Sequence, residues 1–138
     1  RNAFEDTRDV LENEASGLTV ILHCFGYGPA EAQTFVERGY SISFAGNLTY
    51  KRSDALREAY ALVPGDQLLL ETDSPYMNPE PSRGKPSSSL DIARTYACAA
   101  MQRGSDPGSL RAIVAHNAWR IFGPGPSLSA EKAPLLDG

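Results

Sequence analysis

The sequence has 138 residues, of which 41% are hydrophobic and 22% are charged, a composition typical of one soluble globular domain. Its formal net charge of −4 excludes a broad basic surface, so any contact with nucleic acid has to be local or mediated by metal. No apolar stretch approaches the roughly 20 residues that cross a bilayer, and two widely spaced cysteines favour reduced thiols, so we expect a cytoplasmic or other intracellular protein without membrane contact.

The chain begins with a predicted helix and a predicted strand. Apolar residues recur among charges at near-helical spacing over residues 3–15, and Ser16-Gly17 ends the pattern. Residues 18–22, Leu-Thr-Val-Ile-Leu, form a continuous apolar run that is too short for a typical helix. This run predicts a buried parallel strand that ends at His23.

Two more pairs of helix and strand follow. Pro29 begins a helix that Gly39 ends, and residues 40–44 form the next predicted strand. Residues 53–62 predict a further helix, and residues 67–70 predict the third strand. Strands that alternate with helices of this length indicate βαβ units, and therefore an α/β fold with a parallel sheet and helices outside it.

The second half of the chain has a different pattern. Residues 74–89 hold four prolines and five serines and predict a long loop at the carboxyl end of a strand, where α/β folds place their sites. Two helices are expected at 90–102 and 109–122, and residues 124–138 are expected to form a loosely ordered tail. Three parallel strands leave two unpaired edges, so we expect part of the fold to lie outside this chain.

His23 is the first candidate for chemistry, because it stands where a strand gives way to a loop with Gly26 and Gly28. A neutral imidazole in this place is a good ligand for zinc or a similar ion, although a histidine can also simply form hydrogen bonds at a strand end. Alternation along the strand predicts that Cys24 points to the opposite side from His23 and is packed rather than metal-ligating.

Glu71 and Asp73 follow the leucines of the third predicted strand. Alternation sends both carboxylates to the same side, where they are costly unless a cation, a hydrogen-bond network or proton sharing compensates. We predict that Asp73 binds metal or acts on water as the catalytic carboxylate, and that Glu71 supports it as an orienting or ion-pair partner. The alternative is a carboxylate that caps the following loop.

Basic residues lie in the loops after the second and third strands. Arg83 and Lys85 are within plausible reach of anything bound at Asp73 and could hold a phosphate, although loop cations are often only solvated. Lys51 and Arg52 occupy the equivalent loop after the second strand and have the same two interpretations. The sequence has no P-loop, dinucleotide fingerprint, nucleophile elbow or Cys-x-x-Cys pair, so metal is the cofactor with support.

The last predicted helix carries residues that we interpret as structural. Asn117 is expected to cap this helix or to tie loops together. His116 has no strand close before it that would aim its imidazole at the same site as His23. Trp119, Ile121 and Phe122 are expected to belong to the core.

Several of these residues, in this order and spacing, resemble the TatD family of metal-dependent hydrolases and deoxyribonucleases. The resemblance covers residues 1–123. The run Leu-Leu-Leu-Glu-Thr-Asp-Ser-Pro-Tyr, with His-Cys-Phe about 50 residues upstream, is its most specific part. The matching stretches are LTVILHCFGYG, GYSISFAGNLTYK, LLLETDSPY, the loop 79–85 and HNAWRIFG.

The resemblance implies a TIM-like (β/α)8 barrel, of which this chain would supply about three βα units from the C-terminal portion. It implies that His23 and Asp73 bind divalent metal, which could be Mg²⁺, Mn²⁺ or Zn²⁺. It further implies that metal-activated water cleaves phosphodiester bonds of DNA, as single strands or ends, with Arg83 and Lys85 on a phosphate. The remaining ligands of the family, including a His-x-His pair, would precede Arg1.

Other interpretations stay open at this point. The chain could be a catalytically incomplete fragment or a half-barrel that acts as a structural or association module, paired with the missing half-barrel or with itself as a homo-oligomer. The barrel could also act on amide or ester bonds. Two departures from the family pattern concern the loops near the metal: Gly26-Tyr27-Gly28 follows His-Cys-Phe, and Pro86-Ser87 stands where the family often has Asn-Glu.

Overall fold

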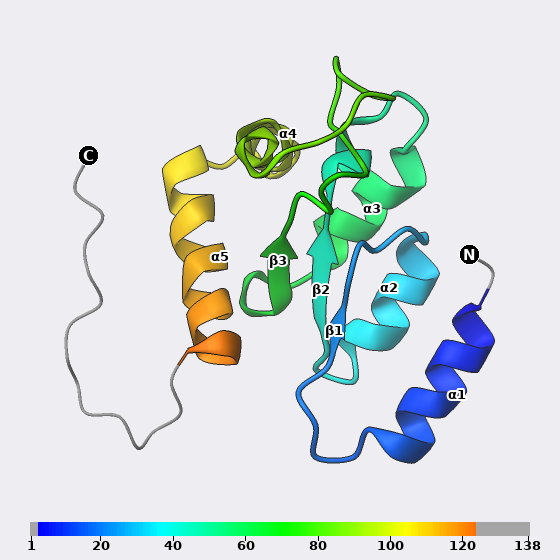
Figure 1. Ribbon diagram of the computed structural model, residues 1–138. Helices are drawn as coiled ribbons and strands as arrows, with labels where there is room; N and C mark the ends of the chain where they lie inside the picture. Colours follow the sequence, from blue (N-terminus) through cyan, green and yellow to red (C-terminus); the bar gives the residue numbers. More distant parts are fainter. Residues whose placement is uncertain (1–2, 124–138) are drawn as a thin grey trace.

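The structure is a computed structural model that describes residues 3–123, so the prediction for residues 124–138 lies outside the described residues. Helices and strands alternate along the first half of the chain, and two helices close it (Figure 1). The strands are β1 (Ile21–Leu22), β2 (Ser41–Phe44) and β3 (Leu68–Leu70). The helices are α1 (Phe4–Glu14), α2 (Pro29–Val36), α3 (Asp54–Leu62), α4 (Ile92–Arg103) and α5 (Pro107–Phe122), with short 3-10 turns η1 (Gly46–Thr49), η2 (Gly65–Gln67) and η3 (Ser89–Asp91).

The three strands form a parallel sheet in the order β1-β2-β3. Two backbone hydrogen bonds extend the pairing beyond the strands themselves: Phe25 N donates to Ser43 O at 2.9 Å, and Glu71 N donates to Phe44 O at 2.9 Å. The carboxyl ends of β1 and β3 are thereby held against β2. The predicted α/β fold with parallel βαβ units is confirmed.

The core lies between the sheet and the helices that follow its strands. Ile42 and Phe44 of β2 are fully buried and pack in one cluster with Phe35 of α2 and Tyr60 of α3. Their neighbour Ser43 is also buried, but alternation turns it to the other face of the sheet. That face therefore carries a small polar side chain in the middle of the sheet.

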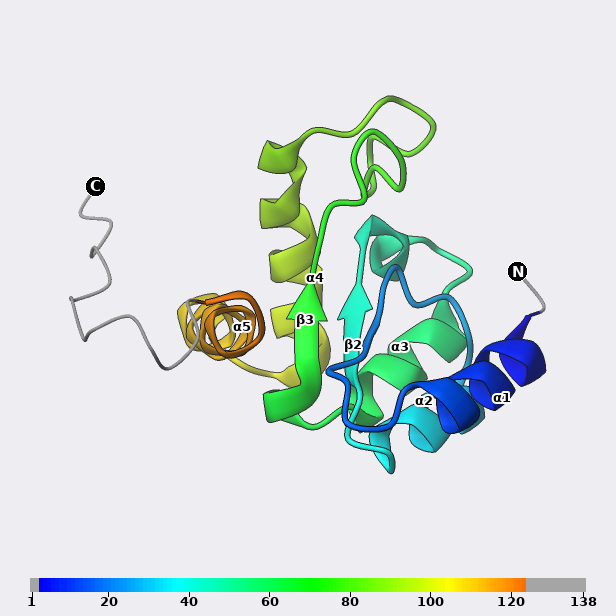
Figure 2. The same cartoon turned by 60° about the horizontal axis from the view of Figure 1, so that its bottom comes forward.

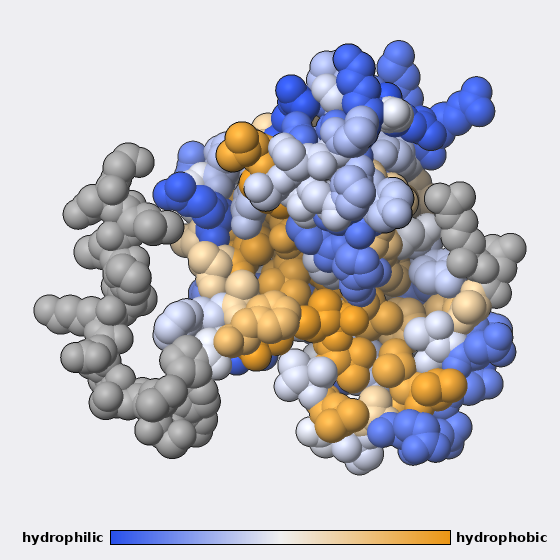
Figure 3. Space-filling model, viewed as in Figure 1, coloured by the Kyte–Doolittle hydropathy of each residue, from blue (hydrophilic) through white to orange (hydrophobic). Residues whose placement is uncertain are grey.

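The helices cover one face of the sheet. Figures 1 and 2 show α2 and α3 on one side of β2, with α5 beyond β3 and α1 at the opposite end of the layer. No described helix lies over the face that is turned to the viewer in Figure 1. In the same view, Figure 3 shows apolar residues gathered between α5 and α1, below a hydrophilic region formed by the upper loops.

Two expectations about burial are wrong. Residues 18–22 are expected to form one buried strand, but only Ile21–Leu22 pair as a strand, and Leu18 is 66% exposed. On α5, Trp119 is 58% and Phe122 is 71% exposed, whereas Ile121 does pack against the core. Among the described elements, helix α5 packs mainly against β3, α4 and η2, and Trp119 and Phe122 lie outside these contacts on its exposed surface.

Asn117 on α5 is a tie between elements, as expected. Its side chain is 1% exposed, and its amide Nδ2 donates to Gly65 O at 2.6 Å and to Leu68 O at 2.8 Å. These two carbonyls flank the start of β3. Asn117 therefore holds α5 against the strand that leads to Glu71 and Asp73.

None of the helices in the described part of the chain is long and apolar enough to span a membrane.

Candidate metal centre and adjoining cavity

Three potential metal ligands meet at the carboxyl edge of the sheet. His23 follows β1, and Glu71 and Asp73 follow β3. Nδ1 of His23 lies 2.7 Å from Oε1 of Glu71, and Nε2 lies 3.3 Å from Oδ1 of Asp73. One ligand atom from each of the three residues can be chosen so that all lie within 4.8 Å of one another. The parallel strands bring together residues that are 48 or more positions apart in the sequence.

The two carboxylates are half-buried and the imidazole is more open. The side chains of Glu71 and Asp73 are each 21% exposed, and that of His23 is 66% exposed. Ser43 Oγ, on the polar face of β2, donates a short hydrogen bond to Glu71 Oε2. This bond orients the carboxylate and leaves its second oxygen turned toward His23.

The environment of the second carboxylate oxygen of Glu71 is an argument for a cation site in this cluster. Oε1 is buried, and no described group gives it a well-directed hydrogen bond, although His23 Nδ1 lies close by. A buried carboxylate oxygen without a donor is costly. A divalent ion would compensate it, and one imidazole with two carboxylates is a donor set that suits zinc, manganese or magnesium. The residues present therefore fit the metal that the sequence predicted, and the geometry adds Glu71 to the potential ligands.

The backbone turns sharply at both ends of this cluster. Cys24 has φ of 46° and Asp73 has φ of 54°, a left-handed conformation that costs non-glycine residues on the order of 1 kcal/mol. The strand alternation stops at these residues. The left-handed turn places Cys24 on the wall of a cavity, and Cys24 is not one of the potential metal ligands that meet among the described residues.

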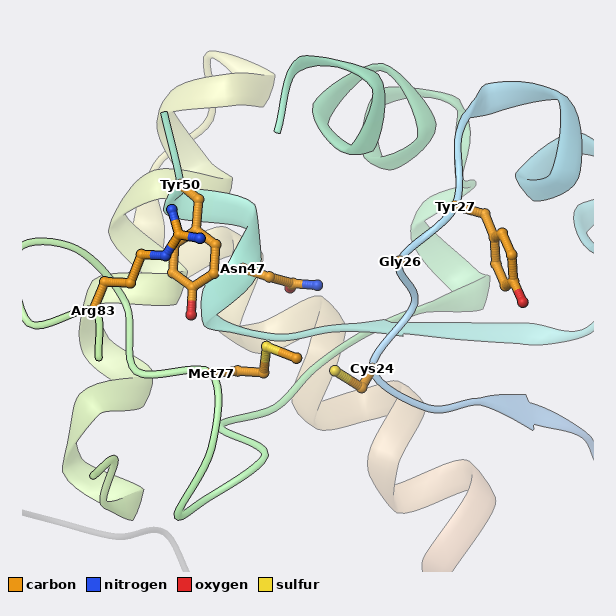
Figure 4. A pocket seen from close by; sticks show the side chains of 7 residues that line it. All are labelled: Cys24, Gly26, Tyr27, Asn47, Tyr50, Met77 and Arg83. Carbon is orange, nitrogen blue, oxygen red and sulfur yellow. The ribbon is translucent and has the colours of Figure 1, made fainter. Parts of the chain in front are cut away.

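A cavity of about 530 Å³ lies among the loops that follow the strands (Figure 4). Its walls come from the loops that follow all three strands. The β1 loop supplies the residue next to His23, and the β3 loop supplies a residue four positions after Asp73. The lining residues are Cys24, Gly26, Tyr27, Asn47, Tyr50, Met77 and Arg83.

Arg83 is the cation of this cavity. Its guanidinium carbon lies 4.3 Å from the centre of the Tyr50 ring, and Figure 4 shows the two side chains overlapping. Burial raises the pKa of the Tyr50 phenol and the Arg83 charge opposes that rise, so the phenol is neutral near pH 7. Lys85 lies on the same turn as Arg83 but does not line the cavity. The exposed Lys51 and Arg52, in the loop after β2, do not line it either.

The sequence patterns missed several residues of this region. Tyr50 is an aromatic residue next to Lys51 in a loop at a strand end, and this combination could have marked it. Nothing local distinguished Asn47, Met77 or Ser43. His116 lies on α5 and lines two other surface hollows together with Asp66. It does not belong to the His23 cluster.

Comparison with known proteins supports the family suggested by these residues. The sequence profile described as TatD related DNase matches residues 1–123. A Mycobacterium tuberculosis protein named "Uncharacterized metal-dependent hydrolase TatD" is 38% identical over 125 residues, which are 91% of this chain and 47% of that protein. The "3'-5' ssDNA/RNA exonuclease TatD" of Erwinia amylovora is 36% identical over 108 residues, which are 75% of this chain and 42% of that protein.

A solved structure gives the same result for the fold. The crystal structure of YJJV, a TatD homolog from Escherichia coli K12, superposes with a TM-score of 0.83 at 27% identity and covers 90% of this chain and 48% of that one. The chain thus spans about half the length of the relatives it matches. The three-stranded sheet corresponds to part of a TIM-like hydrolase barrel. The match over residues 1–123, together with this fold, shows that the chain belongs to the TatD related DNase family.

Proposed function

We propose that the protein carrying this chain is a divalent-metal hydrolase that cleaves phosphodiester bonds in single-stranded DNA, and that His23, Glu71 and Asp73 belong to its metal centre. The convergence of three ligand atoms beside a cavity with a cationic wall carries this proposal. The name of the Erwinia relative, a 3'-5' ssDNA/RNA exonuclease, supports a nucleic-acid strand as the substrate.

Each residue has a role that follows from its position. When bound, a divalent ion supplies Lewis acidity that polarises a phosphoryl oxygen and lowers the pKa of water. His23 and Glu71 would hold the ion, and Ser43 orients Glu71 through its hydrogen bond. Asp73 would also hold the ion, and its carboxylate would accept a proton from the attacking water. Arg83, with Lys85 on the same turn, offsets the charge of the phosphates.

The test uses the complete protein in which this chain occurs, with 5'-labelled single-stranded DNA and added Mn²⁺ or Mg²⁺. We expect removal of nucleotides from the 3' end and a fall of at least about a hundredfold in kcat for Asp73→Asn, because the ligand and proton acceptor are both impaired. Asp66→Asn, at the opposite end of β3, is the matched control and should retain activity. Hydrolysis of amides or esters without any cleavage of DNA would refute the proposed substrate.

The 138-residue polypeptide by itself is a separate case. It spans about half the length of its relatives, so half of the barrel that surrounds the site in those relatives is outside it. We propose that the isolated polypeptide binds metal through His23, Glu71 and Asp73 but turns over DNA far more slowly than the complete protein. An intracellular location stays a prediction from the sequence.

A further inference from the structure

The loop that carries Arg83 is braced against the loop after β2. Gly46 at the start of η1 is so close to this loop that a Cβ there would collide with Met77 O and lie 2.8 Å from Pro79 N. Thr49 Oγ1, at the end of η1, accepts a hydrogen bond of 2.8 Å from Glu80 N. The two loops therefore form one packed unit at the edge of the cavity.

Arg83 occupies the tip of a tight turn within this unit. Lys85 N donates to Ser82 O at 3.1 Å, and Gly84 has φ of 87°, the conformation that a type II turn needs at its third position. Ser82 Oγ also accepts a hydrogen bond of 3.2 Å from Arg94 of α4. The backbone on both sides of Arg83 is thus fixed by named contacts, although the residue itself is exposed.

The exposed guanidinium of Arg83 lies against the ring of Tyr50. The Tyr50 ring covers one face of the guanidinium at 4.3 Å, a cation–π arrangement that still leaves the N–H groups at the edge of the plane available. No described carboxylate forms an ion pair with Arg83. An arginine that is stacked but has no carboxylate partner is suited to bind an anionic ligand in the cavity.

We propose that Tyr50 is a positioning residue that holds Arg83 to bind a phosphate of the nucleic-acid strand next to the scissile bond. This proposal rests on the proposed function for the identity of the strand. The cavity of about 530 Å³ falls within the range of roughly 300–1,000 Å³ that accommodates small ligands, and its lining includes Cys24, which directly follows His23, and Met77, four positions after Asp73. A strand whose scissile phosphate lies at His23 and Asp73 therefore has a neighbouring phosphate to place at Arg83.

Variants at both positions test the proposal in the complete protein. Arg83→Gln should raise KM for single-stranded DNA about tenfold with little change in kcat, the loss expected for one charge-assisted hydrogen bond. Tyr50→Leu should raise KM similarly, whereas Tyr50→Phe should behave like the wild type because it keeps the ring. The double variant Arg83→Gln/Tyr50→Leu should be no worse than Arg83→Gln alone, since Tyr50 acts through Arg83.

Salt dependence provides a readout that a purely structural role of Tyr50 would not change. Binding of a labelled oligonucleotide is measured by fluorescence anisotropy in EDTA at several salt concentrations. The slope of log Kd against log salt concentration should fall by about 0.7 in Arg83→Gln and in Tyr50→Leu, as expected for one lost phosphate contact on a single strand. Arg111→Gln, which removes an exposed arginine of α5, is the control and should leave slope and KM unchanged.

The outcomes separate this proposal from the proposed function. If the wild type cleaves DNA but Tyr50→Leu has the wild-type KM and salt slope, the positioning role is refuted. If an abasic nucleotide at the neighbouring position weakens binding in the wild type but not in Arg83→Gln, Arg83 stacks on a base and the phosphate assignment is wrong. If DNA is bound with the expected slopes but never cleaved, the positioning role is supported and the proposed reaction fails.

Discussion

At the scale of single residues, Asn117 connects the last helix to the strand that leads to the metal centre. Its buried amide donates to Gly65 O and Leu68 O, the carbonyls on either side of the entry to β3. These carbonyls lie at the end of the strand opposite to Glu71 and Asp73, so Asn117 contributes to the placement of the carboxylates without touching them. Its neighbour His116 is exposed.

Replacing Asn117 should therefore affect stability before chemistry. Asn117→Ala removes two hydrogen bonds and leaves the carbonyls of Gly65 and Leu68 without this donor, so we expect the free energy of unfolding to fall by about 2 kcal/mol. His116→Ala, one position away on the same helix, should change it by less than about 0.5 kcal/mol. Urea unfolding of both variants checks this, and equal effects of the two substitutions would contradict it.

At the scale of elements, α5 begins with a capping arrangement in its first turn. Asp106 accepts hydrogen bonds from Ser109 N at 2.9 Å and Ser109 Oγ at 3.3 Å, and Pro107 occupies the first helical position. The preceding helix α4 ends at Gly104 with φ of 59°. The sharp change of direction between α4 and α5 thus depends on residues whose conformational preferences agree with it.

The cap of α5 can be tested by a pair of substitutions. Asp106→Ala should lower the free energy of unfolding by about 1 kcal/mol, because Ser109 N loses its acceptor. Asp106→Asn keeps a side-chain oxygen and should lose a few tenths of that amount. Thermal unfolding followed by circular dichroism measures both. An equal loss in Asp106→Asn and Asp106→Ala would mean that charge, rather than capping, is the stabilising feature.

At the scale of the whole molecule, the sheet has an open face and open edges. Among the described elements, β1 and β3 each pair with β2 alone, and no helix covers the face turned to the viewer in Figure 1. In the solved relative, which is about twice as long as the matched part, this region belongs to a larger fold. The open face is where association with the rest of a barrel, or with another copy, would bury apolar surface.

We therefore expect the isolated 138-residue polypeptide to self-associate. Light scattering after size-exclusion chromatography should give a mass above 14.9 kDa that rises with concentration, because open strand edges and apolar surface favour association. Leu18→Lys, just before β1, should weaken this association, whereas Val10→Lys on α1, similarly exposed, should not. A constant monomer mass at all concentrations would show that the open face is stable in water.

Most of the fold and the main residues of the site could be predicted from the sequence. Apolar runs ending at His23 and Glu71 predicted parallel strands, and parallel strands bring the residues after them to one edge. The exposure of Trp119 and Phe122 could not be predicted in this way, because apolar spacing marks a helix but does not show which of its sides other elements cover. Tyr50 and Arg83 are 33 positions apart, and no local pattern connects them.

The carboxylate of Asp73 shows which features of the site follow from the sequence and which follow only from the tertiary structure. The sequence by itself determined that two carboxylates follow a buried strand and need compensation, since charge next to an apolar run is costly wherever the chain folds. Only the tertiary structure decided that both contact the same imidazole, that Ser43 orients Glu71, and that Cys24 turns to a cavity wall. These features depend on backbone turns and on contacts between distant strands, which local sequence does not encode.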